Sequence, residues 1–271
     1  MKTTADLSAL SLMEIKMTEK MTDVQEIPSA EEFYSAFERI FKECGLTHYV
    51  VPQYAERFYA LVRYMTDEGR KLNVTSITRT EDVICRHFAD SVAFADVFEQ
   101  GASVIDIGTG GGFPSLPLAI VRSDLHITAL DSTAKKIRYV EQAAEFIGLE
   151  DFKAISGRAE ELSAADGPFR ESFDYAVSRA VAAMPVLCEL CLPFVHQGGY
   201  FVALKGPGGD DEMQRAVSAV DTLGGKFSEK REAILRCGDE ALKHYAFILQ
   251  KNAATPIKYP RNFSKINKKP L

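Results

Sequence analysis

The pattern of hydrophobic positions changes near residue 101. Before it, apolar residues recur at helical spacing, which predicts helices at about 31–44, 52–65 and 81–98. After it, short continuous apolar runs alternate with helical stretches, as is typical of buried parallel strands joined by helices. We therefore expect a helical first part followed by a doubly wound α/β sheet.

The second part contains seven segments of strand length, most of them apolar. We expect strands at 103–107, 126–130, 152–155, 173–177, 200–204, 226–235 and 245–250. Helices are expected between them, at 116–121, 137–147, 182–192 and 211–223. The resulting organisation is a poorly ordered leader at 1–28, a helical subdomain at 29–100, a sheet domain at 101–251 and a tail at 252–271.

Composition excludes several classes of protein. Hydrophobic residues make up 46% and charged residues 26% of the 271 residues, as in ordinary globular chains. No window holds the roughly 18 consecutive apolar residues of a membrane-spanning helix, and the leader lacks the apolar segment of a secretory signal. Five cysteines, an odd number, do not suggest a disulfide framework. We expect a cytoplasmic, reduced, monomeric protein that does not bind membranes.

Charge is distributed unevenly along the chain. The net charge is −6, yet residues 251–271 contain six basic residues and no acidic one. A basic tail on an acidic body suits local contact with a polyanion. The alternative is a solvated tail that only favours solubility.

A glycine-rich loop follows the first expected strand. It reads Asp106-Ile-Gly108-Thr-Gly110-Gly-Gly112, and glycines there let the backbone turn tightly and approach a ligand. A dinucleotide-binding fingerprint would need a third glycine where Phe113 stands, which argues against an NAD enzyme. The pattern D-x-G-x-G-x-G is the form seen in S-adenosylmethionine-dependent methyltransferases.

An acidic residue ends the second expected strand, 23 residues beyond Gly108. Asp131 stands where a carboxylate commonly binds a ribose diol, although it could instead cap the next helix. Ala159 and Glu160 follow the third strand, where such sheets contact the adenine of a nucleotide; the alternative there is an exposed start of a helix.

The chain resembles the guanine-N7 methyltransferases of bacterial small-subunit ribosomal RNA, the RsmG family, also called glucose-inhibited division protein B. The resemblance runs from about Phe33 to the end and rests on motifs in order: Leu72–Thr75, His87–Ser91, Asp106–Pro114, Leu116–Ile120, Asp131-Ser132, Lys135-Lys136, Arg158–Glu160, Ser178–Ala180, Leu204–Gly206, Tyr259–Arg261 and Lys268–Leu271. The chain departs from the family pattern at Ser115, Ser264 and Ile266, the last two in the tail.

The resemblance implies a class I S-adenosylmethionine-dependent methyltransferase fold, a mostly parallel seven-stranded sheet with an antiparallel last strand and an N-terminal helical extension. It also implies methyl transfer from S-adenosyl-L-methionine to N7 of a guanine in 16S ribosomal RNA, either free or in the assembling small subunit. Together with the loop and ribose arguments it gives these cofactor contacts: Asp106, Gly108, Gly110, Phe113, Asp131, Ala159, Glu160 and Arg179. The residues expected to contact RNA are Asn73, Thr75, His87, Lys205, Arg261, Lys265, Lys268 and Lys269.

The expected reaction needs no general base, because guanine N7 carries a lone pair and no proton. The enzyme needs proximity and orientation instead, with Arg179 in a positioning role. The chain lacks the Asn/Asp-Pro-Pro-aromatic motif of exocyclic-amine methyltransferases and the Pro-Cys dipeptide of cytosine-C5 methyltransferases. Cys188 and Cys191 have C-x-x-C spacing in an apolar helix with no second pair of ligands, so we expect no metal site.

Several assignments stay open on the sequence alone. Arg179 could line the site or form a structural ion pair, and His87 and Asp90 could position RNA or attach the helical part to the sheet. Asn73 and Thr75 could contact a base or phosphate, or simply cap a turn. Two other functions are also compatible: a methyltransferase of small molecules or proteins, and a non-catalytic RNA-binding module.

Overall fold

The computed structural model describes residues 27–69, 72, 75–179 and 181–271. The expected disorder of the leader and the expected RNA contact by Asn73 lie outside the described residues. No helix within these ranges is both long and apolar enough to cross a membrane.

The first part is helical, as predicted, with more breaks than the sequence pattern suggests. Its elements are α2 (Ala30–Glu43), η1 (Thr47–Tyr49), α3 (Pro52–Tyr64), η2 (Met65–Gly69), α5 (Thr80–Val83), η3 (Ile84–Ala89), α6 (Asp90–Val92) and η4 (Ala95–Val97). A capping box between Ser29 and Glu32 starts α2. The segment expected to be one helix at 81–98 is instead divided, with a π-helical turn at η3 that carries His87.

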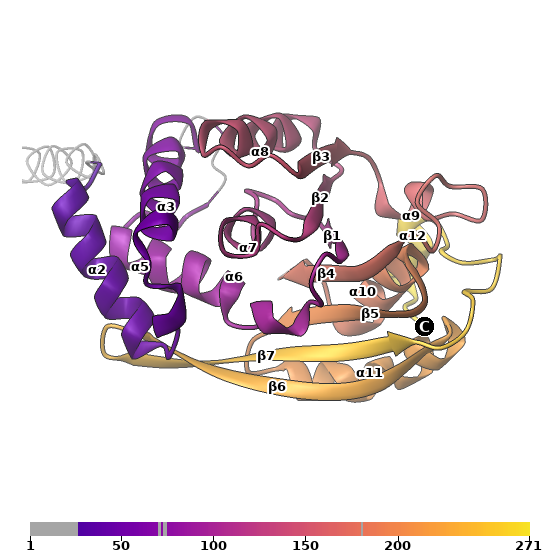
Figure 1. Ribbon diagram of the computed structural model, residues 1–271. Coiled ribbons are helices and arrows are strands. Elements are labelled where there is room, and N and C mark those ends of the chain that lie inside the picture. The colour runs from indigo at the N-terminus through magenta and orange to yellow at the C-terminus, as the bar shows by residue number, and fades with distance from the viewer. Residues whose placement is uncertain (1–26, 70–71, 73–74, 180) are drawn as a thin grey trace, which may run out of the picture.

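The second part is one seven-stranded sheet (Figure 1). Its strands are β1 (Ser103–Ile107), β2 (His126–Asp131), β3 (Phe152–Ser156), β4 (Phe173–Arg179), β5 (Val195–Lys205), β6 (Gly225–Cys237) and β7 (Glu240–Lys251), in the order β3-β2-β1-β4-β5-β7-β6. All neighbours pair in parallel except at β7, which is antiparallel to β5 and β6. This confirms the expected fold class.

Helices cover both faces of the sheet. They are α7 (Ser115–Val121), α8 (Ala134–Phe146), α9 (Ala159–Leu162), α10 (Met184–Cys191), α11 (Gly209–Thr222) and α12 (Phe263–Lys268), with a short η5 (Leu192–Phe194). One core joins the helical part to α7, α8 and one face of the sheet, and includes Phe33, Phe58 and Leu116. A second core lies under α10 and α11. The helical part therefore packs directly on the sheet and shares its core.

The long hairpin of β6 and β7 also holds the helical part (Figure 1). Arg86 of η3 forms an ion pair of 2.6 Å with Glu240, and Cys85 forms a disulfide with Cys237. This disulfide corrects the expectation that every cysteine is a thiol. Because it joins residues 152 positions apart, no local spacing could have indicated it.

The tail folds back onto the sheet domain, which contradicts the alternative of a solvated tail for the segment as a whole. The Lys251 ammonium is fully buried and donates to Glu171 at 3.0 Å and to the Thr255 hydroxyl at 2.7 Å. The Arg170 guanidinium donates to the Tyr259 carbonyl at 2.6 Å. Ile266 of α12 lies fully buried in the second core. Apolar burial and neutralised charge hold the segment in place.

Candidate active site

The glycine loop lies between β1 and α7. The amides of Gly108 and Thr109 donate to the Leu130 carbonyl at 2.8 and 3.0 Å, which ties the loop to β2. Gly108 has φ of +76°, and a Cβ there would approach the Val181 side chain to 2.6 Å. Only glycine satisfies both the left-handed backbone and this close approach.

Asp106 lies beneath the loop, and this corrects its expected contact with the cofactor. Its carboxylate is fully buried, and Oδ2 accepts the Ser115 amide proton at 3.3 Å. Burial raises the pKa of Asp106 to about 6, against the hydrogen bonds from Thr109 and Ser115, which lower it. Oδ1 has no hydrogen-bond partner among the described residues. Asp106 supports the start of α7 and does not line a cavity.

Asp131 ends β2 and connects the loop to the next turn. Its Oδ2 accepts the Gly110 amide proton at 3.1 Å, and its Oδ1 accepts the Thr133 amide proton at 2.8 Å. The contact with Thr133 forms a turn before α8 and is not the helix cap that was one of the two interpretations of Asp131, because Thr133 itself is the N-cap residue of α8. It also lines a cavity at this edge of the sheet.

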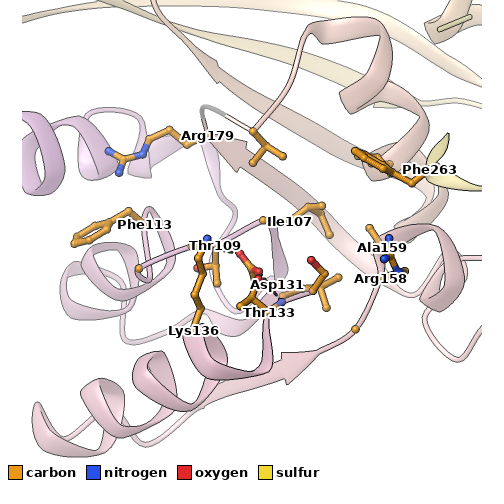
Figure 2. A pocket seen from close by; sticks show the side chains of 18 of the residues that line it. Ile107, Thr109, Phe113, Asp131, Thr133, Lys136, Arg158, Ala159, Arg179 and Phe263 are labelled. Carbon is orange, nitrogen blue, oxygen red and sulfur yellow. Dashed lines mark hydrogen bonds between the residues drawn. The ribbon is translucent and has the colours of Figure 1, made fainter. Parts of the chain in front are cut away.

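A cavity of about 550 Å³ opens at the carboxyl ends of β1, β2 and β4 (Figure 2). It brings together most of the expected cofactor residues and one expected RNA residue: Gly108, Gly110, Phe113, Asp131, Ala159, Glu160, Arg179 and His87. The sequence analysis did not predict several of its lining side chains as site residues, among them Lys136, Val181 and Phe263. The sequence offered one signal for Phe263: it is an aromatic residue in a basic segment. Phosphate binding does not explain an aromatic ring there.

Arg179 lies at one end of this cavity and is anchored by Asp90. The guanidinium forms an ion pair of 2.7 Å with Asp90 Oδ2 and lies 3.3 Å from His87 Nδ1. His244 of β7, which the sequence analysis did not single out, meets Asp90 Oδ1 at 2.5 Å. Burial alone would raise the pKa of Asp90, but the contacts from His244 and Arg179 outweigh it and lower that pKa. Asp90 therefore joins the helical part to β4 and β7.

His87 completes this end of the cavity. Its ring stacks on Phe113 with centroids 4.5 Å apart, and its Nε2 lies 2.8 Å from the Thr75 hydroxyl. Burial and the charge of Arg179 lower the pKa of His87 to about 4, although Asp90 acts in the opposite direction. Thr75, which also accepts the Ile77 amide proton at 3.0 Å, is placed to orient His87.

A second cavity, of about 510 Å³, adjoins the first and shares His87, Arg179 and Val181 with it. Lys205, the last residue of β5, lines it and has its side chain only 8% exposed. Its ammonium donates to the Ala182 carbonyl at 2.6 Å and to Glu212 at 2.8 Å. Lys205, which was expected to contact RNA, is thus held at the wall of this cavity and is not an exposed cation.

The expected RNA residues of the tail divide into two groups. Arg261 is held by the fully buried carboxylate of Glu189, with Nη2 and Oε2 2.6 Å apart, so its guanidinium has a structural ion pair. Lys265, Lys268 and Lys269 are exposed on and beside α12. These three lie outside both cavities.

Cys188 and Cys191 are fully buried in α10, and burial raises the pKa of Cys188 to about 12. Within the described ranges, no group of three His, Cys, Asp or Glu side chains is placed to hold a metal ion.

Comparison with known proteins places this geometry in a family. The family described as GidB, rRNA small subunit methyltransferase G, matches residues 54–233. The chain is 45% identical over 209 residues to a ribosomal RNA small subunit methyltransferase G of Clostridium novyi (strain NT), covering 76% of this chain and 85% of that relative. It is 40% identical to the protein of the same name from Clostridium beijerinckii, over 89% of this chain and 99% of that one.

A solved structure supports the fold alone. The branched-chain polyamine synthase C9 mutein of Thermus thermophilus matches with a TM-score of 0.52 at 14% identity, covering 75% of this chain and 66% of that one. The assignment to a family rests on the sequence relatives, because the alignments cover 85% and 99% of their lengths. The chain belongs to the family of ribosomal RNA small subunit methyltransferase G.

Proposed function

We propose that this protein transfers a methyl group from S-adenosyl-L-methionine to N7 of a guanine in 16S ribosomal RNA, free or within the assembling small subunit. The observation that carries the proposal is the first cavity, where the glycine loop and the Asp131 carboxylate meet at the carboxyl edge of the sheet. Family membership supplies the class of substrate.

The lining of this cavity fits the cofactor. Gly108 leaves a space that a Cβ would fill, Asp131 offers carboxylate oxygens to a ribose diol, and the volume of about 550 Å³ suits a nucleoside ligand. Ala159, Glu160 and the Phe263 ring would flank the adenine. The methionine end would then lie toward Phe113 and Arg179.

The chain's own groups supply orientation. S-adenosylmethionine provides an electrophilic methyl group, to which N7 forms a bond with its lone pair while the C–S bond breaks and leaves its electron pair on sulfur. His87, whose pKa is about 4, is neutral near pH 7, and it need not act as a base because N7 carries no proton. Methylation makes the base cationic, and the Asp90 carboxylate offsets the charge of Arg179 beside it. All these groups come from one chain, so the proposal needs neither a second subunit nor a metal ion.

The exposed lysines of the tail would contact the RNA backbone. Lys265, Lys268 and Lys269 project from the segment that also carries Phe263, so RNA bound there would lie beside the cavity. The proposal places the protein in the cytoplasm, with its ribosomal substrate.

The direct test is to incubate the protein with cofactor that carries a labelled methyl group and with total ribosomal RNA. The RNA is taken from cells that lack this protein. Mapping of N7-methylguanine should find the label at one guanine of 16S RNA. Label in small molecules, in protein or at another base atom would contradict the proposal. Binding of RNA without transfer would favour the non-catalytic alternative.

A further inference from the structure

The second cavity lies where an acceptor base has to enter. It shares His87, Arg179 and Val181 with the first cavity, at the end where the methionine part of the cofactor would lie. An in-line displacement brings the nucleophile to the face of the methyl group opposite sulfur. The acceptor atom therefore has to approach this shared wall from the second cavity.

The charged side chains of Lys205 and Glu212 line the second cavity and not the first. Glu212, in the first turn of α11, accepts the Met184 amide proton at 2.9 Å and a Lys205 ammonium proton at 2.8 Å. Both bonds end on Oε2, so among the described residues Oε1 is left to accept from a ligand. The Lys205 ammonium has three protons, and the bonds to Ala182 and Glu212 use two. The pair is thus fixed in place. The Glu212 Oε1 atom, with its two lone pairs, and one ammonium proton of Lys205 remain for a ligand.

We propose that this cavity holds the target guanine and that Glu212, together with Lys205, recognises the Watson–Crick edge of the base. The inference rests on the proposed function and adds a residue that selects guanine. Enzymes that act on a single base commonly extrude it and read that edge by hydrogen bonds. Here a carboxylate would accept from N1–H and the N2 amine, and an ammonium would donate to O6.

The order of the elements matches the order of atoms around guanine. Arg179 of β4 is the register partner of Leu204 on β5, and Lys205 follows Leu204 directly. Glu212 lies beyond Lys205, on α11. A guanine with N7 at the shared wall would therefore place O6 near Lys205 and its N1–H and N2 amine near Glu212. Adenine presents an amine where guanine has O6, so it would set a donor against the ammonium.

The test compares guanine with inosine, which keeps N7, O6 and N1–H but lacks the N2 amine. Single-turnover methyl transfer is measured on 16S RNA that carries either base at the mapped target position. The parent protein should prefer guanine by roughly 10-fold or more, because inosine leaves a polar group of the site unpaired. In Glu212→Gln, transfer to guanine should slow and the preference for guanine should fall at least several-fold.

Asp211→Asn is the matched control, because it removes the same charge from an exposed neighbour in the same helical turn that does not line the cavity. It should keep the parent preference. Affinity for S-adenosylhomocysteine, measured by calorimetry, should stay within about twofold in both variants, which shows that the first cavity is intact.

The outcomes separate the two proposals. If the parent methylates no guanine of 16S RNA, the proposed function fails. If it methylates guanine but does not distinguish inosine, or if Glu212→Gln slows both substrates equally, recognition by Glu212 is wrong while the function stands. Equal transfer to guanine and inosine by the parent alone overturns recognition of the N2 amine, and a preference that Glu212→Gln leaves unchanged overturns the role of Glu212.

Discussion

The Asp131 carboxylate has two tasks within a single residue: it accepts the amide protons of Gly110 and Thr133, and it faces the first cavity. Replacement by alanine should weaken binding of S-adenosylhomocysteine by roughly 10- to 100-fold, or about 1.5–3 kcal/mol, the scale of hydrogen bonds to a charged group. Isothermal titration calorimetry measures this change.

A ligand that lacks the ribose hydroxyls separates the two tasks. If Asp131 binds the diol, Asp131→Ala should reduce affinity for the dideoxy analogue much less than affinity for the natural product. An equal loss for both ligands would assign the effect to the shape of the loop and refute the ribose contact.

His87 should make stability depend on pH. Its pKa is about 4 in the folded protein and about 6.5 in an unfolded chain, so the unfolded state takes up a proton first as the pH falls. The contribution is therefore complete above pH 6.5 and is lost as the pH falls toward 4. The loss should be about 3 kcal/mol relative to His87→Gln, which cannot titrate. Urea unfolding of both proteins at several pH values measures it, and parallel curves would contradict the assignment.

Among the elements, the tail contains basic residues of two kinds, a buried arginine in an ion pair and exposed lysines, which net charge does not distinguish. Arg261 neutralises the fully buried Glu189, and Arg261→Gln would leave that carboxylate without its charged partner. We expect a loss of about 3–5 kcal/mol in the free energy of unfolding, since breaking a buried pair leaves one charge unpaired. The double variant with Glu189→Gln should recover much of it. A double variant as unstable as the single one would show that packing, not charge, holds the tail.

The three exposed lysines of the tail should act on RNA instead of stability. Replacing Lys265, Lys268 and Lys269 by glutamine should flatten the slope of log affinity against log salt by up to about 2, roughly 0.7 for each lost phosphate contact. The melting temperature should stay nearly constant. Glutamine at Lys153 and Lys226, exposed near the amino ends of β3 and β6, should leave the slope unchanged. An unchanged slope in the triple variant would exclude the phosphate contacts.

The helices and strands with the clearest hydrophobic pattern were the ones predicted best from the sequence. All seven predicted strands occur. Central strands such as β1 and β4 are buried on both faces and therefore favour apolar residues, whereas β6 lies at the edge of the sheet with most of its side chains exposed. The prediction of one helix at 81–98 was wrong. The apolar spacing of this segment does not distinguish an α-helix from one with a π-helical turn. In the fold, η3 and the residue after it place His87 against Phe113 and Asp90 against Arg179.

Across the whole molecule, motifs located the first cavity and one part of the second, through His87, Arg179 and Lys205. The glycine loop and Asp131 are close in sequence and their geometry follows from a strand, a turn and a helix. Glu212, His244 and Phe263 reach the two cavities from α11, β7 and α12, and only the assembled sheet brings those elements together. The same limit explains Lys205 and Arg261, whose carboxylate partners lie 7 and 72 residues away.

The shared wall of the two cavities has a consequence for the design of inhibitors. A molecule that joins an adenosine fragment to a purine fragment can occupy both hollows at once, because they meet at His87, Arg179 and Val181. Binding of the first fragment would present the second at an effective concentration in the millimolar range, provided the linker is short and matches the span. Extending such a ligand toward Glu212 would favour this chain over methyltransferases that have only the cofactor loop in common with it.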